Sequence, residues 1–451
     1  MHPADQHYQE TLAEGFILRW GTAADLPSLD QLYGTVFGDE LESGFNQYVV
    51  ANTHGLLSGK HPHCSPEDFA VVSDATGRIV AATVLMRMNI EYAGTYLQGG
   101  RPEMVASYPE VRNRGFIRGI FRLIHARSEQ RGDLFQGITG IPYYYKQFGY
   151  DYALTLGGSV SLPATVIPAA SLVEEPFSIR PAQYDDIMQL QMLFERERSR
   201  MYERLPMLAT SRIDATYWRW AINGSTSHEP LKPYTWQPYM ITDRAGEVVG
   251  SIGLARIRAI EDMAIHFCNT EPHVRLADVY PSLLRAIYAT SQTIPTWDSL
   301  TKPCSGVRLL LGVGHPFYAL VSHLPHVVYQ PYGWYLRVAD LPSFIGKIAS
   351  VLEKRLSQSV YAGYTGMLLF DFYRGGLQFR IDKGRISAQQ WAGTPGATAS
   401  YPPNVFLQQL FGLHSLSELK QSHMDVRANG ETAQILDILF PKQASWLLPL
   451  D

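Results

Sequence analysis

The sequence predicts a mixed α/β fold, more narrowly an α+β arrangement of mixed central sheets flanked by helices. Two observations predict it: a pattern of strand, turn and helix that occurs twice in the same order, and a change to short strands and Gly turns after Asp340. The chain has 451 residues, of which 46% are hydrophobic and 18% charged. It is therefore long enough for two or three well-packed domains.

The duplication begins near the N-terminus. "FILRWGTAADLPSLDQL" at 16–32 matches "FSIRPAQYDDIMQLQML" at 177–193, and each copy predicts a strand, a turn and an Asp that caps an amphipathic helix. Each is followed by a hairpin with a D-x-x-G turn, "VVSDATGRIVAAT" and then "MITDRAGEVVGSI". The matched residues include Arg19 with Arg180, Asp25 with Asp186, and Leu29 with Leu190.

The duplication divides the chain into three expected domains, 1–160, 170–340 and 341–451. The two copies differ after Pro109 and Pro272, because "EVRNRGFIRG" follows the first whereas "HVRLADVYPS", with one arginine and no glycine, follows the second. We expect the second copy to have lost the binding function and to be structural. The last domain is expected to start with the helix "LPSFIGKIASVLEKRL" and to continue with short strands and helices.

The arginine-rich loop is the first candidate site. "EMVASYP" predicts a strand that ends before it, and the apolar spacing from Phe116 predicts a helix that ends near Gly132. Gly115 thus lies at a strand-to-helix turn, where backbone N–H groups and a partial positive charge favour a phosphate. The arginines would add charge-assisted contacts to a pyrophosphate. Alternatively, Arg114, Arg118 and Arg122 form only a solvated helix face.

The segment after this helix carries the second candidate. "DLFQGITG" predicts the next strand, and "IPYYYKQFGY" predicts a short helix and a turn. Tyr145 lies four residues before Gly149, which places its hydroxyl beside the strand end where a ligand would leave the loop. The three adjacent tyrosines could equally serve packing.

A strand, an R-x-x-G loop, a helix, a strand and Y-x-x-x-G-Y in this order resemble the acetyl-CoA-binding core of the GCN5-related N-acetyltransferases (GNAT). More narrowly, "PEVRNRGFIRG", "YYKQFGY", the degenerate second copy and the C-terminal module resemble the enhanced-intracellular-survival (Eis) type. That type has tandem GNAT-like domains and a sterol-carrier-protein-like (SCP2-like) domain. The resemblance implies an N-acetyltransferase that uses acetyl-CoA as co-substrate.

The resemblance also implies roles for matching residues. The strand before the loop would bind the pantetheine and the acetyl carbonyl, Tyr145 would be the general acid, and the C-terminal carboxylate would be the general base, which indicates Asp451. Because the chain ends in aspartate where the Eis type often ends in an aromatic residue, either carboxylate of Asp451 could serve, provided that Asp451 is the natural terminus. The implied cofactor-binding residues are Val105, Ala106 and Ser107 on the strand, and Arg112, Asn113, Arg114, Gly115, Phe116, Ile117 and Arg118 in the loop and helix start.

The acceptor implied by the resemblance is a primary amine of a small polycationic molecule, such as an aminoglycoside or a polyamine, or of a lysine side chain. Asp39, Glu40 and Glu42 would suit such an amine but equally form a solvated loop. The resemblance implies a homo-oligomer, with a hexamer as one form. Two alternatives remain open: a hydrophobic-ligand carrier with a cavity between 368–373 and 406–413, and a non-catalytic acetyl-CoA sensor.

Other features limit the function. A net charge of −4 and a pI near 6.4 do not favour nucleic-acid binding. No apolar run is long enough to cross a membrane, and the N-terminus does not resemble a signal peptide, so we expect a cytoplasmic protein. The three cysteines contain no CxxC pair. His54, His61, His63 and Cys64 lack a second pair of ligands at useful spacing, so we expect no metal site.

Overall fold

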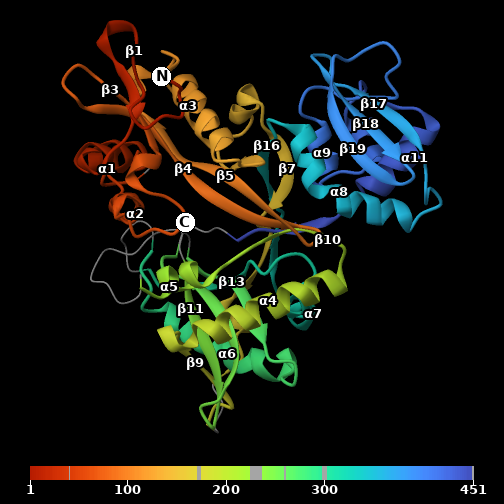
Figure 1. Cartoon of the computed structure of the whole chain (residues 1–451). Coiled ribbons are helices and arrows are strands. Elements are labelled where there is room, and N and C mark those ends of the chain that lie inside the picture. Colours follow the sequence, from red (N-terminus) through yellow and green to blue (C-terminus); the bar gives the residue numbers. More distant parts are fainter. Residues whose placement is uncertain (40, 170–173, 224–235, 259–260, 297–301, 449–451) are drawn as a thin grey trace.

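The computed structural model describes residues 1–451 except 40, 170–173, 224–235, 259–260, 297–301 and 449–451. Three mixed or antiparallel sheets flanked by helices occupy three lobes (Figure 1). The predicted mixed α/β fold is therefore confirmed.

The first sheet forms the upper left lobe of Figure 1 and has ten strands. Helices α1 and α3 both contact β4 and β5, and α2 packs on α1. The bounds of these helices are α1 (Leu26–Val36), α2 (Gln47–Leu57) and α3 (Phe116–Gln130). In sheet order the strands are β1 (Gln9–Thr11), β2 (Ile17–Trp20), β3 (Phe69–Ser73), β4 (Ile79–Tyr92), β5 (Thr95–Ser107), β6 (Phe135–Ile138), β16 (Tyr332–Arg337) and β7 (Asp151–Leu156), with β10 (Met207–Ser211) and β22 (Ala444–Trp446) attached to the end of β4.

The second sheet forms the lower lobe and has seven strands. It contains the second copy of the hairpin, β11 with β12, which corresponds to β3 with β4 in the first sheet. The strands in order are β15 (Val327–Tyr329), β8 (Ser159–Pro163), β14 (Gly306–Leu309), β13 (Asp262–Thr270), β12 (Val248–Ala255), β11 (Trp236–Asp243) and β9 (Phe177–Pro181). The helices are α4 (Ile187–Arg204), α5 (Ala215–Asn223), α6 (Leu276–Ser291) and α7 (Pro316–Val321).

The third sheet, in the right lobe, has five strands and is built from the last part of the chain. Its long helix α8 (Leu341–Ser357) packs on β19 and buries Phe344, Ile348 and Leu352. The strands in order are β19 (Arg385–Trp391), β18 (Gly376–Asp382), β17 (Gly366–Asp371), β20 (Ala399–Ser400) and β21 (Arg427–Ala428), and the other helices are α9 (Phe406–Leu410), α10 (Leu416–Ser422) and α11 (Gly430–Leu439).

Strands are exchanged between the first two sheets. β16 lies between β6 and β7, with Tyr335 opposite both Ile138 and Tyr152. Conversely, β8 follows directly after the first copy but pairs with β14 and β15 in the second sheet. Segments proposed as separate domains thus complete each other's sheets.

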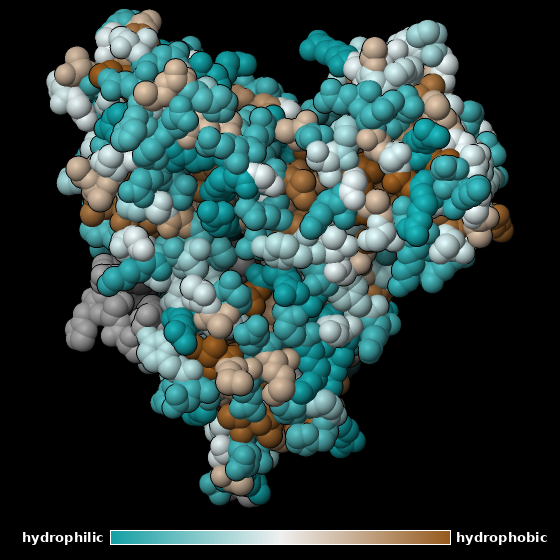
Figure 2. Space-filling view, in the orientation of Figure 1, coloured by the Kyte–Doolittle hydropathy of each residue, from teal (hydrophilic) through white to brown (hydrophobic). Residues whose placement is uncertain are grey.

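The surface in the view of Figure 2 is mostly hydrophilic, with apolar patches over the lower lobe. In the part of the chain that the structure describes, no helix is both long and apolar enough to cross a bilayer.

Candidate active site

The site begins at an irregularity in β5. The pairing of β5 with β4 shifts register between Ala82 and Val84, and Met104 there has a φ of +54°. A bulge of this kind bends the strand and re-aims its side chains. β5 pairs with β6 only at Gly99 and Gly100, so beyond these residues the two strands separate and leave a gap in the sheet.

The arginine-rich loop follows the end of β5 directly. After a short 3-10 turn at Pro109–Val111, Gly115 takes a φ of +80° and forms the N-cap of α3. A Cβ at this position would meet no atom within 4 Å, so glycine is favoured here by the left-handed backbone and not by close packing. The predicted strand-to-helix turn is confirmed, and α3 buries Ile120, Leu123 and Ile124 beneath it.

A cavity of about 720 Å³ lies along the end of β5, this loop and the start of α3. Nine of the ten residues predicted to bind the cofactor line it, so sequence neighbours from the strand, the turn and the helix face one space. Arg114 is the exception. The nine lining residues are Val105, Ala106, Ser107, Arg112, Asn113, Gly115, Phe116, Ile117 and Arg118.

The arginines divide into two groups. Arg114 forms an ion pair with Glu14 and lies over the Phe16 ring, and Arg122 forms an ion pair with Glu10. These two therefore fit the interpretation as a charged outer face of the helix. Arg112 and Arg118 instead line the cavity, and the guanidinium of Arg118 donates a 3.3 Å hydrogen bond to Gln147. The cavity therefore keeps two exposed cations beside a helix N-terminus, an arrangement that fits a phosphate group.

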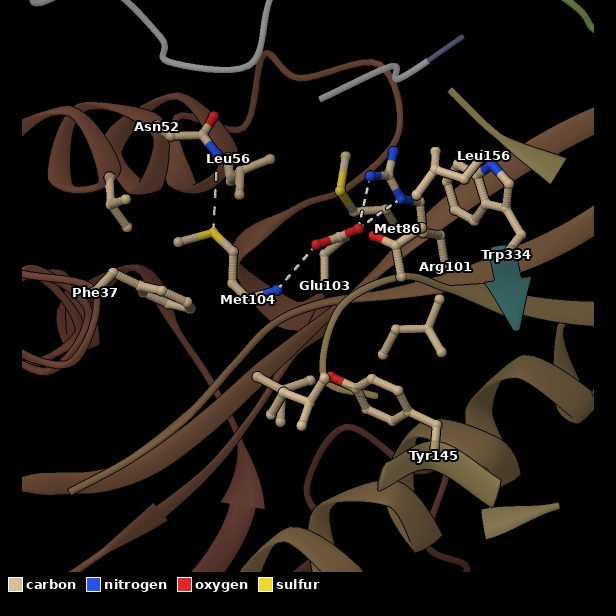
Figure 3. Close-up of a pocket in the computed structure, with 15 residues that line it drawn as sticks. Phe37, Asn52, Leu56, Met86, Arg101, Glu103, Met104, Tyr145, Leu156 and Trp334 are labelled. Atoms are coloured by element: carbon tan, nitrogen blue, oxygen red, sulfur yellow. Dashed lines mark hydrogen bonds and ion pairs between the residues drawn. The ribbon is translucent and has the colours of Figure 1, made fainter. Parts of the chain in front are cut away.

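A second cavity, of about 330 Å³, adjoins the first. We call it the acceptor cavity (Figure 3). The two cavities share Phe37, Val105 and Ile141 as lining residues. The other residues of the acceptor cavity are Val49, Asn52, Leu56, Met86, Arg101, Glu103, Met104, Ile138, Thr139, Tyr145, Leu156 and Trp334.

Tyr145 lies on the wall of the acceptor cavity, and its hydroxyl points into the cavity (Figure 3). It belongs to the 3-10 helix η5 (Tyr144–Phe148), and its ring is held edge-on by Tyr144 and Tyr335 at centroid distances of 5.2 and 5.5 Å. Burial, followed by the negative charge of Glu103, raises the pKa of Tyr145 well above its ordinary value. The hydroxyl therefore holds its proton at neutral pH.

Glu103 was not predicted as a site residue. Its carboxylate accepts hydrogen bonds from the Arg101 guanidinium, at 2.6 and 2.8 Å, and from the Met104 N–H at 3.3 Å. It lies beside the bulge, inside the acceptor cavity (Figure 3). The sequence signal, an Arg-x-Glu alternation on one strand, is too common to identify such a pair in advance.

Strand β16 supplies two further residues that sequence reasoning missed. Trp334 lines the acceptor cavity, and the Tyr335 hydroxyl accepts a 2.6 Å hydrogen bond from the Tyr143 N–H. Tyr335 also stacks on Tyr152 at a centroid distance of 4.0 Å. Because β16 is nearly 200 residues beyond Tyr143 in the chain, only the alternation of aromatic residues in "YGWYLR" could have indicated a strand there, and not its position.

Asp451 lies outside the described residues. The described chain ends at Leu448, whose N–H donates a 2.9 Å hydrogen bond to the Ser211 hydroxyl. Leu447 and Leu448 line a small cavity together with Leu156, which also lines the acceptor cavity. The end of the described chain is thus one side chain away from the acceptor cavity.

The remaining candidates lie elsewhere. Asp39 and Glu42 are exposed and do not line the acceptor cavity, and Glu40 is outside the described residues. Tyr318 accepts from the Leu311 N–H and donates to the Leu309 carbonyl, a structural arrangement. Among the described residues, no group of three or more His, Cys, Asp or Glu side chains is placed to hold a metal ion.

The fold and the site define an acyltransferase. Residues 18–153 match the family model of the acetyltransferase (GNAT) domain, which supports an acyltransferase. The match covers the bulged strand, the arginine-rich loop, α3 and Tyr145. No curated protein matches the sequence significantly.

Solved structures share the fold along nearly the whole chain. A probable N-acyltransferase of unknown function from Enterococcus faecalis has a TM-score of 0.65 at 14% identity, covering 96% of this chain and 99% of its own. A GCN5-related N-acetyltransferase from Kribbella flavida has a TM-score of 0.63 at 16% sequence identity, and the match covers 96% of this chain and 98% of that one. Eis1 from Mycobacterium abscessus has a TM-score of 0.56 at 13% sequence identity, and the match covers 95% of this chain and 98% of that one. At these identities the likeness concerns the fold.

Proposed function

We propose that the protein transfers an acetyl group from acetyl-CoA directly to a primary amine. The observation that carries this proposal is the junction of the two cavities at Val105 and Ile141, with Tyr145 on the wall of one of them. A thioester whose phosphates lie at Arg112 and Arg118 would reach that junction along β5. When bound, acetyl-CoA supplies the activated acyl group, and the chain's own residues place it and move protons.

Three kinds of group have separate roles in the proposed transfer: backbone N–H groups of β5, the Tyr145 hydroxyl and a carboxylate of Asp451. Backbone N–H groups of β5 beyond Gly100, where the printed pairing with β6 ends, would favour the negative charge that develops on the carbonyl oxygen. Tyr145 gives its proton to the departing thiolate. An amine with a pKa near ~10 is mostly protonated at neutral pH, so a carboxylate must first take its proton. We assign that step to a carboxylate of Asp451, because the described chain end approaches Leu156.

The acceptors that the Eis-type resemblance favours are aminoglycosides, polyamines and lysine side chains. Because a fold alone does not choose between them, all three classes belong in the first assays. The test is thiol release from acetyl-CoA with a panel of amines, using the intact protein, Tyr145→Phe, and a chain lacking Asp451. Asp451→Asn separates the terminal carboxylate from the side chain, and Tyr184→Phe, at an exposed tyrosine outside both cavities, is the matched control.

Turnover that falls at least about a hundredfold in Tyr145→Phe, and strongly in the shortened chain, is expected. Bound acetyl-CoA with no turnover on any amine would instead favour the alternative of a non-catalytic acetyl-CoA sensor.

The alternative of a hydrophobic-ligand carrier has less support, because aromatic rings fill the space between 368–373 and 406–413. The ring centroid of Phe370 lies 5.4 Å from that of Phe406 and 4.9 Å from that of Phe379. The ring centroids of Phe406 and Phe440 are 5.4 Å apart.

We also propose a homo-oligomer in a reducing compartment such as the cytoplasm. β15 is the edge strand of the second sheet, and its Val327 and Val328 are 54% and 56% exposed. An exposed apolar edge strand is a site for pairing with another chain. Cys64, Cys268 and Cys304 are buried and form no disulfide with one another, which suits a compartment without disulfide formation. Light scattering on the intact protein and on Val328→Lys, which should dissociate, tests the assembly.

A further inference from the structure

The walls of the acceptor cavity indicate which amine it takes. Ten of its fifteen lining residues are aliphatic, sulfur-containing or aromatic side chains that carry neither a charge nor a hydroxyl or amide group. Its charged lining residues are Arg101 and Glu103, which are bonded to each other. Among the described residues, Glu103 is thus the one acidic side chain on the cavity wall. The apolar members are Phe37, Val49, Leu56, Met86, Met104, Val105, Ile138, Ile141, Leu156 and Trp334.

This lining disfavours a polycation. Each ammonium group that loses water without gaining a carboxylate partner is strongly destabilised. A second ammonium beyond the one at Glu103 would find no further carboxylate among the described lining residues. It would meet apolar side chains, the guanidinium of Arg101, or the uncharged Asn52, Thr139 and Tyr145. A base contributed by Asp451, as proposed above, would serve the reacting nitrogen.

Glu103 can bind one ammonium group. One of its carboxylate oxygens accepts from Arg101, while the other accepts, among the described residues, a single 3.3 Å hydrogen bond from the Met104 N–H. A carboxylate oxygen has room for a second donor. Glu103 is two residues before Val105, at the junction of the cavities, and its charge reaches Tyr145. An amine held at Glu103 would therefore lie next to the position of the thioester.

The size of the cavity limits the rest of the acceptor. A volume of about 330 Å³ is at the lower end of the range for ligand pockets, roughly 300 to 1,000 Å³. Figure 3 shows Leu56 and Trp334 on opposite sides of Glu103, with Met86 and Leu156 on the Trp334 side. Apolar surfaces on both sides suit a compact aromatic or branched aliphatic group.

We infer that the acceptor is a primary amine with one positive charge on a compact apolar body, with its ammonium at Glu103 and its body between Leu56 and Trp334. This inference rests on the proposed acetyl transfer and narrows its substrate class. Arylalkylamines are the simplest compounds with this chemistry.

The test compares kcat/KM for phenethylamine, spermidine, kanamycin and a lysine peptide with the intact protein. We expect phenethylamine to exceed spermidine and kanamycin by about tenfold or more. Equal or higher values for the polycations would overturn the inference while leaving the acetyltransferase intact. Absence of turnover with every amine would overturn the proposed function, and the inference with it.

Two variants test the role of charge. Glu103→Gln should raise the KM for phenethylamine about tenfold or more, with a smaller change in kcat, because it removes a charged hydrogen-bond acceptor. Phe37→Glu adds a carboxylate at a position that is 38% exposed on the cavity wall, and should shift the preference toward spermidine. Met188→Glu, at an 85% exposed position on α4, is the matched control and should leave the preference unchanged. An unaltered spermidine to phenethylamine ratio in Phe37→Glu would contradict the inference even if Glu103→Gln fails to fold.

Discussion

Arg19 holds Asp25 through two hydrogen bonds, at 2.7 and 2.8 Å, just before α1. Arg180 holds Asp186 in the same way before α4, at 2.7 and 2.9 Å. Each aspartate also accepts a backbone N–H three residues earlier, from Thr22 and from Gln183. The same arrangement of arginine, aspartate and backbone N–H thus occurs at two places that are 161 positions apart in the chain. Because the hydrogen bonds agree as well as the residue types, the arrangement supports a duplication.

These pairs predict matched losses of stability. Asp25→Ala and Asp186→Ala each remove a charged bidentate partner and a cap at a site where the aspartate is only 11% exposed. We expect each variant to lose about 1 to 3 kcal/mol of unfolding free energy. Denaturant unfolding provides the measurement.

Asp278→Ala is the control for this comparison. It removes a bidentate pair with Arg275 of similar length, whose partners are 80% and 47% exposed, so it should cost clearly less stability than either buried aspartate. A loss for Asp278→Ala as large as those for the two buried aspartates would show that burial does not set the value of these pairs.

Much of the fold followed from local patterns, because each of them specifies its own structure. The D-x-x-G turns, the strand before the arginine-rich loop and the helix from Phe116 all depend on neighbouring residues. The position of β16 depends on partners far away in the chain, β6 and β7. Local pattern could not reveal that Trp334 belongs to the acceptor cavity, nor that β8 pairs in the second sheet.

The arginines of the arginine-rich loop also show how far local sequence patterns can predict a site. Helical spacing places Arg114, Arg118 and Arg122 near one another, but it does not show which of them has an acidic neighbour. Glu10 and Glu14, from the N-terminal segment around β1, pair with Arg122 and Arg114. Arg118 is left facing the cavity.

Because Arg118 faces the cavity and Arg114 does not, we expect substitutions of these two arginines to affect acetyl-CoA binding differently. Arg118→Ala removes a cation from the cavity wall and should weaken the binding of acetyl-CoA by about tenfold. Arg114→Ala removes a residue that pairs with Glu14 outside the cavity, and should change the affinity by less than about threefold. Isothermal titration calorimetry with each variant measures both. A larger effect for Arg114→Ala would assign the phosphates to the outer face of the helix.

Tyr145 predicts a distinctive kinetic profile. Since burial raises the pKa of its hydroxyl, kcat should show no loss from deprotonation of Tyr145 below about pH 10. Tyr145→Phe should lower kcat by about a hundredfold or more, with little change in acetyl-CoA affinity, because the tyrosine is not among the residues lining the larger cavity. Tyr144→Phe, at the neighbouring ring that does line it, should retain most of kcat. A small loss of kcat in Tyr145→Phe would remove it as the general acid.

Buried histidines predict that the fold weakens in mild acid. Burial lowers the pKa of His63, His266 and His315 to about 4. In the unfolded chain these groups titrate near ~6.5, so between about pH 6.5 and 4 the unfolded state binds more protons than the folded state. Their contribution is therefore fully present above about pH 6.5 and falls as the pH is lowered through this range. Thermal unfolding followed from pH 7.5 to 5 should show a falling Tm.

His315 allows a specific variant for this prediction. Its Nδ1 caps α7 by accepting from the Phe317 N–H at 3.2 Å, and its Nε2 lies 3.0 Å from the Cys268 carbonyl oxygen. His315→Asn preserves a side chain suited to the N-cap but does not titrate. We expect its Tm to fall less steeply between pH 6.5 and 5 than that of the intact protein, even if it is lower at pH 7.5. His326→Asn, at an exposed histidine, is the control and should keep the original slope. Equal slopes for all three proteins would mean that other groups cause the acid sensitivity.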